Sequence, residues 1–254
     1  MGGALSGKVA LVTGAGQGVG QGIALALADA GVDLVIAGRT LEKLQTTQRL
    51  VEERGGAVAC VTCDVRDAAA LEGCMKEAVT RFGGVDILVN NAQEVPLGSL
   101  DDVTDTAFIA GFESGPLATF RLMKHAVPHM RARGGGVIFN LISSAAERWD
   151  MAGYGAYAAV KQATRALTRA AASEWGGDNI RVLNIAPHAE SPGLKWWVQN
   201  NPEEAEAFFR TIPLGRIGRL EEDIGRAVAA LCSPAFAYLT GATIPLDGGQ
   251  ANFG

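Results

Sequence analysis

Short apolar segments alternate with longer amphipathic segments along the whole chain. The apolar segments are rich in Val, Ile and Leu and end at glycine or polar residues, as buried strands do. The segments between them carry Ala, Leu, Glu, Lys and Gln at the spacing of helices. Strands are predicted at Lys8–Thr13, Val32–Ala37, Val58–Cys63, Val85–Asn90, Gly136–Ile142, Ile180–Ile185 and Thr243–Leu246, and helices at Val19–Ala30, Leu41–Arg54, Ala68–Phe82, Asp101–Phe112, Leu117–Arg133, Ala152–Trp175 and Glu221–Cys232.

This alternation predicts an α/β fold with parallel strands. Helices that connect parallel strands cover both faces of the sheet, so we expect a single doubly wound Rossmann domain over residues 1–254, with a seven-stranded parallel sheet. One long stretch, Pro187–Gly218, lies outside the alternation and contains the aromatic pairs Trp196-Trp197 and Phe208-Phe209. Such long connections are usually functional, so we expect a substrate lid at about residues 188–218.

Composition and charge narrow the classes of protein that fit. Of the 254 residues, 48% are hydrophobic and 19% charged, which is typical of a folded chain. The net charge of -5 and the lack of a basic block argue against nucleic-acid binding. The N-terminal segment does not resemble a secretory signal, and no apolar run approaches the ~20 residues of a bilayer span. We therefore expect a cytoplasmic protein that acts on a small molecule, without membrane or nucleic-acid partners.

Neither the cysteines nor the histidines indicate a metal site. Cys60 and Cys63 form a C-x-x-C pair, but within a predicted strand they point to opposite faces. His125 and His129 share a helix face and have no acidic or cysteine partner placed with them. We expect no bound metal and ordinary thiols in a reducing cytosol.

A glycine-rich loop, Thr13–Gly20, joins the first predicted strand to the first helix. Backbone N–H groups at a helix N-terminus favour a pyrophosphate, and glycines let the loop turn tightly beside it. A tight turn without a ligand would also collect glycines, but this position in a doubly wound chain indicates dinucleotide binding. The loop residues expected to bind the cofactor are Gly14, Gln17, Gly18, Val19 and Gly20.

The end of the second strand predicts which dinucleotide is bound. An NAD site would place Asp or Glu there to bind the ribose 2′-hydroxyl, whereas this chain has Arg39 followed by Thr40. A guanidinium suits a 2′-phosphate, so NADP(H) is predicted over NAD(H). The alternative is that Arg39 is a solvated residue at a helix start.

Tyr157 and Lys161 lie four residues apart on the predicted long helix and so share one face. A nearby ammonium is expected to lower the pKa of a tyrosine, ordinarily about 10, toward the range of acid–base catalysis. Ser144 follows a strand at its carboxyl end, where open α/β sheets bind ligands, and its hydroxyl could donate to a carbonyl oxygen. We therefore predict Ser144, Tyr157 and Lys161 as catalytic residues.

In combination these residues resemble the short-chain dehydrogenase/reductase family, in particular its β-ketoacyl reductase-type members. The resemblance also rests on Asp64-Val65, Asn90-Asn91-Ala92, Asn179–Val182, Pro213–Arg216 and Asp247–Gly249. It implies that Asp64 and Val65 border the adenine and that Lys161 contacts the nicotinamide ribose. It also implies a homotetramer in which the long helix enters a four-helix contact. The further residues implied in cofactor binding are Asn91, Ala92, Tyr157 and Pro187.

The chain departs from the family pattern at three positions. Gln93 stands where the family has glycine. His188 follows Pro187, whereas the family has glycine after this proline. Gly115 holds the place of an asparagine that relays protons, and the following Pro116 predicts that the helix breaks there. From their positions near the expected nicotinamide and lid, the residues expected to contact the substrate are Gln93, His188, Trp196 and Trp197.

The favoured interpretation is an NADP(H)-dependent oxidoreductase that interconverts a ketone and a secondary alcohol, with an apolar substrate. In this scheme Tyr157 transfers the proton, Ser144 holds the oxygen and Lys161 tunes Tyr157. One alternative is a non-redox enzyme on the same fold, such as a dehalogenase or isomerase. Halohydrin dehalogenases, however, lack the glycine loop and the lysine that are present here. Another alternative is a protein that senses NADP(H) without turnover.

Overall fold

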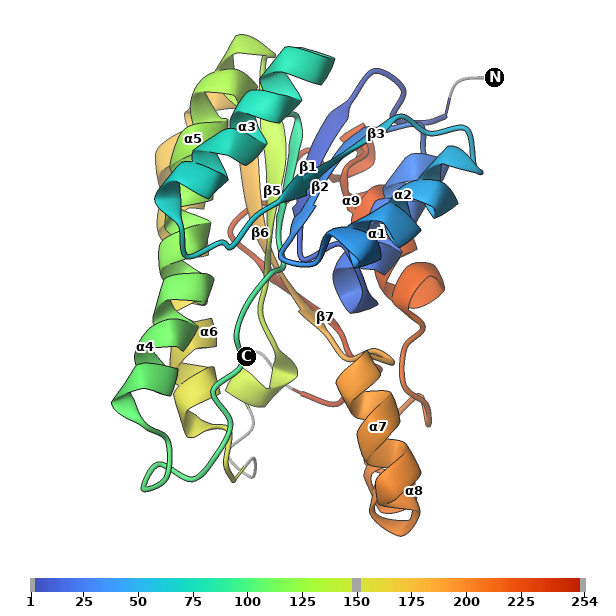
Figure 1. Cartoon of the computed structure of the whole chain (residues 1–254), viewed down its shortest axis with the longest axis vertical. Helices are drawn as coiled ribbons and strands as arrows, with labels where there is room; N and C mark the ends of the chain where they lie inside the picture. Colours follow the sequence, from blue (N-terminus) through green and yellow to red (C-terminus); the bar gives the residue numbers. More distant parts are fainter. Residues whose placement is uncertain (1–2, 148–151, 252–254) are drawn as a thin grey trace.

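The seven predicted strands form one parallel sheet in the order β3-β2-β1-β4-β5-β6-β7 (Figure 1). The computed structural model describes residues 3–147 and 152–251. The doubly wound Rossmann fold is confirmed, with strand ends that differ from the prediction by at most two residues. The strands are β1 (Val9–Thr13), β2 (Asp33–Gly38), β3 (Val58–Thr62), β4 (Ile87–Asn90), β5 (Gly136–Leu141), β6 (Ile180–Pro187) and β7 (Thr243–Leu246).

Helices cover both faces of this sheet, as Figure 1 shows. One core layer lies under α1, α2 and α9, and the other lies under α3, α5 and α6. Cys60 packs against the first layer and Cys63 lies in the second, so the two thiols face opposite sides as predicted. The helices are α1 (Gly18–Asp29), α2 (Leu41–Glu52), α3 (Ala68–Phe82), α4 (Asp105–Phe112), α5 (Ala118–Ala132), α6 (Gly155–Trp175), α7 (Pro192–Asn200), α8 (Pro202–Phe209) and α9 (Arg226–Leu231).

The strand order reverses between β1 and β4, which are neighbours in the sheet. The connection from β1 runs toward β2 and β3, whereas the connection from β4 runs toward β5. At such a reversal the loops at the carboxyl ends of the two strands separate and leave a crevice for a ligand. The topology therefore places the glycine loop after Thr13 beside the loop after Asn90.

The long stretch between β6 and α9 contains two short helices, α7 and α8, which extend beyond the carboxyl edge of the sheet (Figure 1). Ser191 caps α7, since its Oγ accepts a hydrogen bond from the Leu194 N–H at 3.2 Å. The rings of Trp197 and Phe208 meet edge to face at a centroid distance of 5.7 Å, which ties the two helices together.

The predicted break at Gly115-Pro116 is wrong, because the chain stays helical there. A π-helical segment, η1 (Glu113–Leu117), connects α4 directly to α5. The wider π turn accommodates Pro116, which has no N–H to donate. A second π segment, η4 (Leu220–Gly225), precedes α9, so the helix predicted at Glu221–Cys232 forms in two parts. Such π turns often occur at functional sites.

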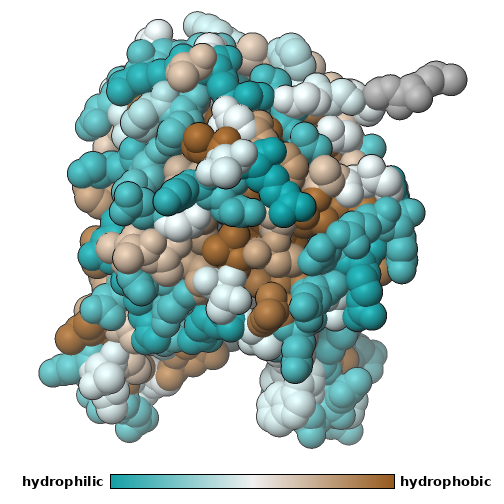
Figure 2. Space-filling model, turned by 45° about the horizontal axis from the view of Figure 1, so that its top comes forward, coloured by the Kyte–Doolittle hydropathy of each residue, from teal (hydrophilic) through white to brown (hydrophobic). Residues whose placement is uncertain are grey.

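Hydrophilic side chains cover most of the face seen in Figure 2, and hydrophobic ones reach that surface in smaller patches. Within residues 3–147 and 152–251, none of the helices combines the length and apolarity that a membrane span would need. The apolar side chains of the described chain are instead gathered mainly in the two layers that flank the sheet.

Candidate active site

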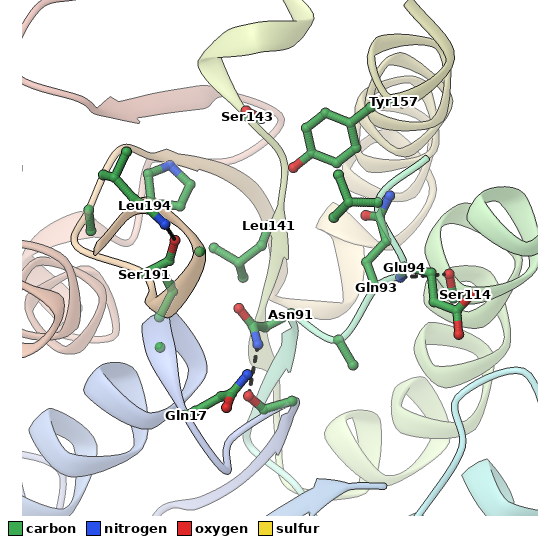
Figure 3. A pocket seen from close by; sticks show the side chains of 18 of the residues that line it. Gln17, Asn91, Gln93, Glu94, Ser114, Leu141, Ser143, Tyr157, Ser191 and Leu194 are labelled. Carbon is green, nitrogen blue, oxygen red and sulfur yellow. Dashed lines mark hydrogen bonds between the residues drawn. The ribbon is translucent and has the colours of Figure 1, made fainter. Parts of the chain in front are cut away.

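A cleft of about 1090 Å³ opens at the carboxyl edge of the sheet, between the strand loops and α7–α8 (Figure 3). It brings together nearly all of the residues that the sequence predicts for the site. Those that line it are Gly14, Gln17, Gly18, Val19, Arg39, Thr40, Asp64, Val65, Asn91, Ala92, Gln93, Ser144, Tyr157, Lys161, Pro187, His188 and Trp197. Two predicted residues, Gly20 and Trp196, do not line it.

The glycine loop has the backbone conformation that its sequence requires. Gly14 and Gly18 adopt φ angles of 66° and 61°, a region that L side chains rarely enter. A Cβ atom on Gly14 would lie 2.6 Å from Asn91 Nδ2, so the close approach also requires glycine. Asn91 holds the loop, because its Nδ2 donates to Thr13 O at 2.9 Å and to Gly14 O at 3.2 Å.

Gly20 packs the first helix and does not line the cleft. A Cβ atom at this position would lie 2.5 Å from both Gly14 O and Asn91 Nδ2. The missing side chain therefore lets α1 approach the loops after β1 and β4. Helix α1 begins at Gly18, and its first residues line the cleft. A helix N-terminus with this glycine cradle fits the pyrophosphate of a dinucleotide.

Four charged side chains form an ion-pair chain at the end of the cleft near β2 and β3. Arg39 Nη1 lies 2.8 Å from Glu94 Oε1, and Arg66 Nη1 lies 3.7 Å from the same oxygen. Arg66 Nη2 also donates to Asp64 Oδ2 at 2.7 Å. The Arg66 hydrogen bond holds the pKa of Asp64 below its usual value. Sequence reasoning missed Arg66 and Glu94, because they lie on loops far from Arg39 in the chain.

Lys161 is buried in the floor of the cleft on α6, with an exposed fraction of 4%. Its Nζ donates to the Leu141 carbonyl oxygen at 2.6 Å and lies 5.4 Å from the centroid of the Tyr157 ring. Burial lowers the pKa of Lys161 to about 7, because the charged ammonium loses hydration. A lysine with this pKa exchanges protons near neutral pH.

The pKa of Tyr157 is raised, contrary to the prediction that Lys161 lowers it. Burial raises this pKa to about 12, and a hydrogen bond from Ser143 opposes the rise. The nearby Tyr154 raises it further. Desolvation of the phenolate thus raises the pKa of Tyr157 by more than the lysine, which is itself desolvated, can lower it. The side chain is a protonated phenol at neutral pH, the form that can give a proton to a substrate oxygen.

The hydroxyl beside Tyr157 belongs to Ser143, not to the predicted Ser144 (Figure 3). The Ser144 Oγ donates instead to Asp247 Oδ2 at 2.7 Å, and this serine is 4% exposed. The backbone of Ser143 is extended, with φ -152° and ψ 144°, so the two neighbouring side chains point in opposite directions. Ser143 therefore faces the tyrosine, while Ser144, which also lines the cleft, fastens the loop to the C-terminal segment.

Aromatic side chains border the cleft on the side of α7 and α8. The rings of His188 and Phe208 meet edge to face at 5.2 Å, and Trp197 also packs edge to face on Phe208. Trp196 is 64% exposed and points away, because neighbouring positions of a helix face different directions. The expectation of a substrate contact at Trp196 is therefore not supported, whereas Leu194 joins the lining unpredicted.

The sequence matches, over residues 14–251, the family model described as enoyl-(acyl carrier protein) reductase. Together with the relatives below, this match shows that the chain belongs to the short-chain dehydrogenase/reductase family. The family consists of oxidoreductases that use a nicotinamide dinucleotide. The glycine cradle, Arg39 and Lys161 line a cleft that fits such a cofactor.

Relatives are similar to the chain over almost its whole length. A 12α-hydroxysteroid dehydrogenase of Clostridium sp. is 39% identical over 98% of both chains, and a 7α-hydroxysteroid dehydrogenase of Escherichia coli K12 is 33% identical over 96% of this chain and 94% of that protein. A solved 7α-hydroxysteroid dehydrogenase complexed with NADH and 7-oxo glycochenodeoxycholic acid superposes with a TM-score of 0.91, at 33% identity over 97% of this chain and 95% of the other. A variant of actinorhodin polyketide ketoreductase with NADPH gives a TM-score of 0.91, at 29% identity over 100% of both chains.

Proposed function

We propose that this protein is an NADP(H)-dependent oxidoreductase that interconverts a ketone and a secondary alcohol. The observation that carries the proposal is that Ser143, Tyr157 and the buried Lys161 line the same cleft as the glycine loop, with Lys161 Nζ 5.4 Å from the centroid of the Tyr157 ring. The bound cofactor would supply the hydride in reduction and accept it in oxidation. The chain's own residues then have to hold the substrate oxygen and move one proton.

Tyr157 is the proton donor in reduction. Its raised pKa keeps the phenol protonated until a more basic oxygen forms beside it. Ser143 holds that oxygen with a hydroxyl, which stabilises the developing negative charge. Lys161, fixed by the Leu141 carbonyl, stabilises the phenolate after the proton has left. In oxidation the same residues act in reverse, and the phenolate of Tyr157 takes the proton.

Arg39 supports the preference for NADP(H). It stands at the end of β2, where an NAD site would have a carboxylate, and it lines the cleft. Arg66 lies close by, so two guanidinium groups reach the same Glu94 carboxylate. A 2′-phosphate is a dianionic acceptor of the kind that paired arginines bind.

We propose a rigid polycyclic alcohol or ketone, such as a hydroxysteroid, as the substrate. Trp197, Phe208 and Leu194 give one side of the cleft an apolar wall that suits a hydrocarbon skeleton. The hydroxysteroid dehydrogenases to which the chain is similar support this class. On this proposal α7 and α8 form the substrate lid, and Gln93 and His188 contact the substrate.

A cytoplasmic homotetramer is proposed as the working form. Apolar side chains are exposed on α4, η1 and α5, and of these α4 and η1 pack against α6, the helix expected in the subunit contact. Burying them against other subunits would remove this apolar area from water. Light scattering after size-exclusion chromatography tests the assembly directly. The exposed side chains are Phe108, Ile109, Leu117 and Phe120.

The test is an assay of 7α- and 12α-hydroxysteroids, and of the corresponding ketones, with NADPH and NADH. Tyr157→Phe is expected to lower kcat about 10²–10⁴-fold, because only the phenolic oxygen can transfer the proton. Its Kd for NADPH is expected to stay unchanged, since the ring is kept. Tyr238→Phe is the matched control, because this tyrosine is exposed and does not line the cleft.

Three outcomes decide between this proposal and its alternatives. A Tyr157→Phe variant that keeps most of its activity overturns the assignment of the proton donor. NADPH binding without turnover on any ketone or alcohol supports a sensor of the cofactor. Conversion of substrate without change in NADPH absorbance supports a non-redox enzyme.

A further inference from the structure

The side chain of Gln93 occupies the space beside Gly115. A Cβ atom on Gly115 would lie 3.2 Å from Gln93 Cδ and 3.3 Å from Gln93 Nε2. It would also lie 2.7 Å from a methyl group of Val160, the residue that precedes Lys161 on α6. The amide of Gln93 therefore fills the place that a side chain at position 115 would take.

The loop that carries Gln93 is fixed to the π-helical segment. The Glu94 N–H donates to Ser114 Oγ at 3.0 Å, and this hydroxyl donates to the Ala110 carbonyl at 2.7 Å. Glu94 follows Gln93 and Ser114 precedes Gly115, so this hydrogen bond fixes the loop to η1 next to the amide. The glutamine side chain is consequently positioned by the fold.

The amide nitrogen of Gln93 is buried and has no hydrogen-bond partner among residues 3–147 and 152–251. Leaving a buried donor unpaired is costly, so such groups nearly always have a hydrogen-bond partner, which can be an ordered water molecule. Figure 3 shows Gln93 extending from the loop after β4 toward Tyr157. The unpaired donor thus lies on the side of the cleft where the proton is transferred.

Lys161 needs further partners on the same side of the cleft. Its ammonium carries three N–H groups, of which the Leu141 carbonyl accepts one. The lysine is almost fully buried, so the others depend on acceptors within the cleft. An amide group offers both an acceptor oxygen and donor N–H groups, and so can join a lysine to a water molecule.

We propose that Gln93 is a positioning residue that links Lys161, through a bound water molecule, to the proton supply of Tyr157. This inference rests on the proposed function of Tyr157 and Lys161. Gly115 has no side chain to compete for this space, and the amide that fills it comes from the loop after β4. The position of the Gln93 amide therefore depends on the glycine at 115.

The first test measures proton delivery in the Gln93→Met variant, which keeps the length of the side chain and removes the amide. We expect kcat to fall about 10–100-fold, less than the roughly 10²–10⁴-fold of a direct acid–base group, because Gln93 acts through a bound water molecule. We expect the solvent isotope effect on kcat to increase, while the Kd for NADPH stays within about twofold. Gln45→Met, at an exposed site on α2, is the control for the chemistry of the substitution.

The second test exchanges the two residues. Gln93→Gly and Gly115→Asn are each expected to lower kcat, the first by removing the amide and the second by crowding Gln93 and Val160. The double variant is expected to recover most of the activity and the original isotope effect. Thermal unfolding shows whether each variant folds. If the double variant does not fold, the Gln93→Met result alone tests the role of the amide.

The third test needs no turnover. NMR titration of the lysine Cε carbons is expected to show the pKa of Lys161 rising by at least about 1 unit in Gln93→Glu, because a carboxylate beside the ammonium favours its charged form. An unchanged Lys161 pKa overturns the proposal, and so does a Gln93→Met variant altered only in KM. Tyr157→Phe is run alongside: if it loses activity while Gln93→Met keeps it, only the Gln93 proposal fails. If both variants stay active, the proposed function fails.

Discussion

Replacing Glu94 by glutamine is expected to strengthen NADPH binding and to leave NADH binding unchanged. Glu94 pairs with Arg39 at 2.8 Å, and Arg39 is the residue proposed to bind the 2′-phosphate. The phosphate must therefore displace the carboxylate before it can bind the guanidinium. Glutamine keeps the shape of the side chain and removes the charge that competes with the phosphate.

The size of the effect follows from the exposure of the ion pair. The Arg39 and Glu94 side chains are 62% and 34% exposed, and such pairs contribute about 0.2–1 kcal/mol. Because about 1.4 kcal/mol corresponds to tenfold in affinity, the gain is about 1.4–5-fold. A charge-assisted hydrogen bond to the phosphate contributes about 1.5–3 kcal/mol, so Arg39 still favours NADPH although its ion pair with Glu94 is lost on binding.

Fluorescence titration of NADPH and NADH into each variant measures the two Kd values. Arg39→Leu is expected to weaken NADPH binding about tenfold or more and to leave NADH binding nearly unchanged. Glu72→Gln, at an exposed site on α3, controls for the change in net charge. Raising the ionic strength should reduce the Glu94→Gln effect, because exposed charges are screened. Equal changes for both cofactors would refute the competition between carboxylate and phosphate.

Two paired substitutions test the substrate side of the cleft. Ser143→Ala is expected to lower kcat about 10²–10³-fold, because it removes a donor to the substrate oxygen. Ser144→Ala is expected mainly to lower the melting temperature. A larger loss of kcat in Ser144→Ala than in Ser143→Ala would restore Ser144 as the catalytic serine. Trp197→Ala is expected to raise KM for a hydroxysteroid several-fold, whereas Trp196→Ala, at an exposed position, is expected to change KM little. Equal effects on KM would contradict the assignment of the apolar wall.

The fold could be predicted from the sequence because each element carries its own periodic signal. The strand at Ile87–Asn90, for example, begins with the apolar run Ile87–Val89 and is buried on both faces, as strands of parallel sheets are. The helix at Ala68–Phe82 was predicted at its observed bounds, since Asp67 caps its start and Gly83 ends it in a left-handed conformation. These signals are local, so no knowledge of the packing was needed.

The details of the site depend on contacts between distant segments and on side-chain direction. Residue spacing pointed to Ser144, but the extended backbone at Ser143 decides which hydroxyl faces Tyr157. The ion pair of Arg39 with Glu94 spans 55 positions of the chain, and no local pattern indicates it. The sequence also places Lys161 near Tyr157 without showing that burial changes the pKa of both groups.

The burial of Lys161 leads to a prediction about stability. Burial lowers its pKa from the usual 10.5 to about 7 in the folded protein. Below pH 7 the lysine is charged in both the folded and the unfolded chain, so the full cost of desolvation opposes folding. Between pH 7 and 10.5 the unfolded chain binds more protons, so this cost declines as the pH rises. A lysine that destabilises the fold in this way is explained by its function.

Lys161→Met is therefore expected to stabilise the protein while abolishing turnover. At about 1.4 kcal/mol per pKa unit, the gain at pH 6 has an upper limit of about 5 kcal/mol. For a chain of this size, 1 kcal/mol shifts Tm by about 2–4 °C, so we expect an increase of several degrees at pH 6 and a smaller one at pH 9. Calorimetry at both pH values, with the exposed Lys76→Met as control, measures the difference. An equal shift at the two pH values, or a lower Tm at pH 6, would show that the buried ammonium does not carry this cost.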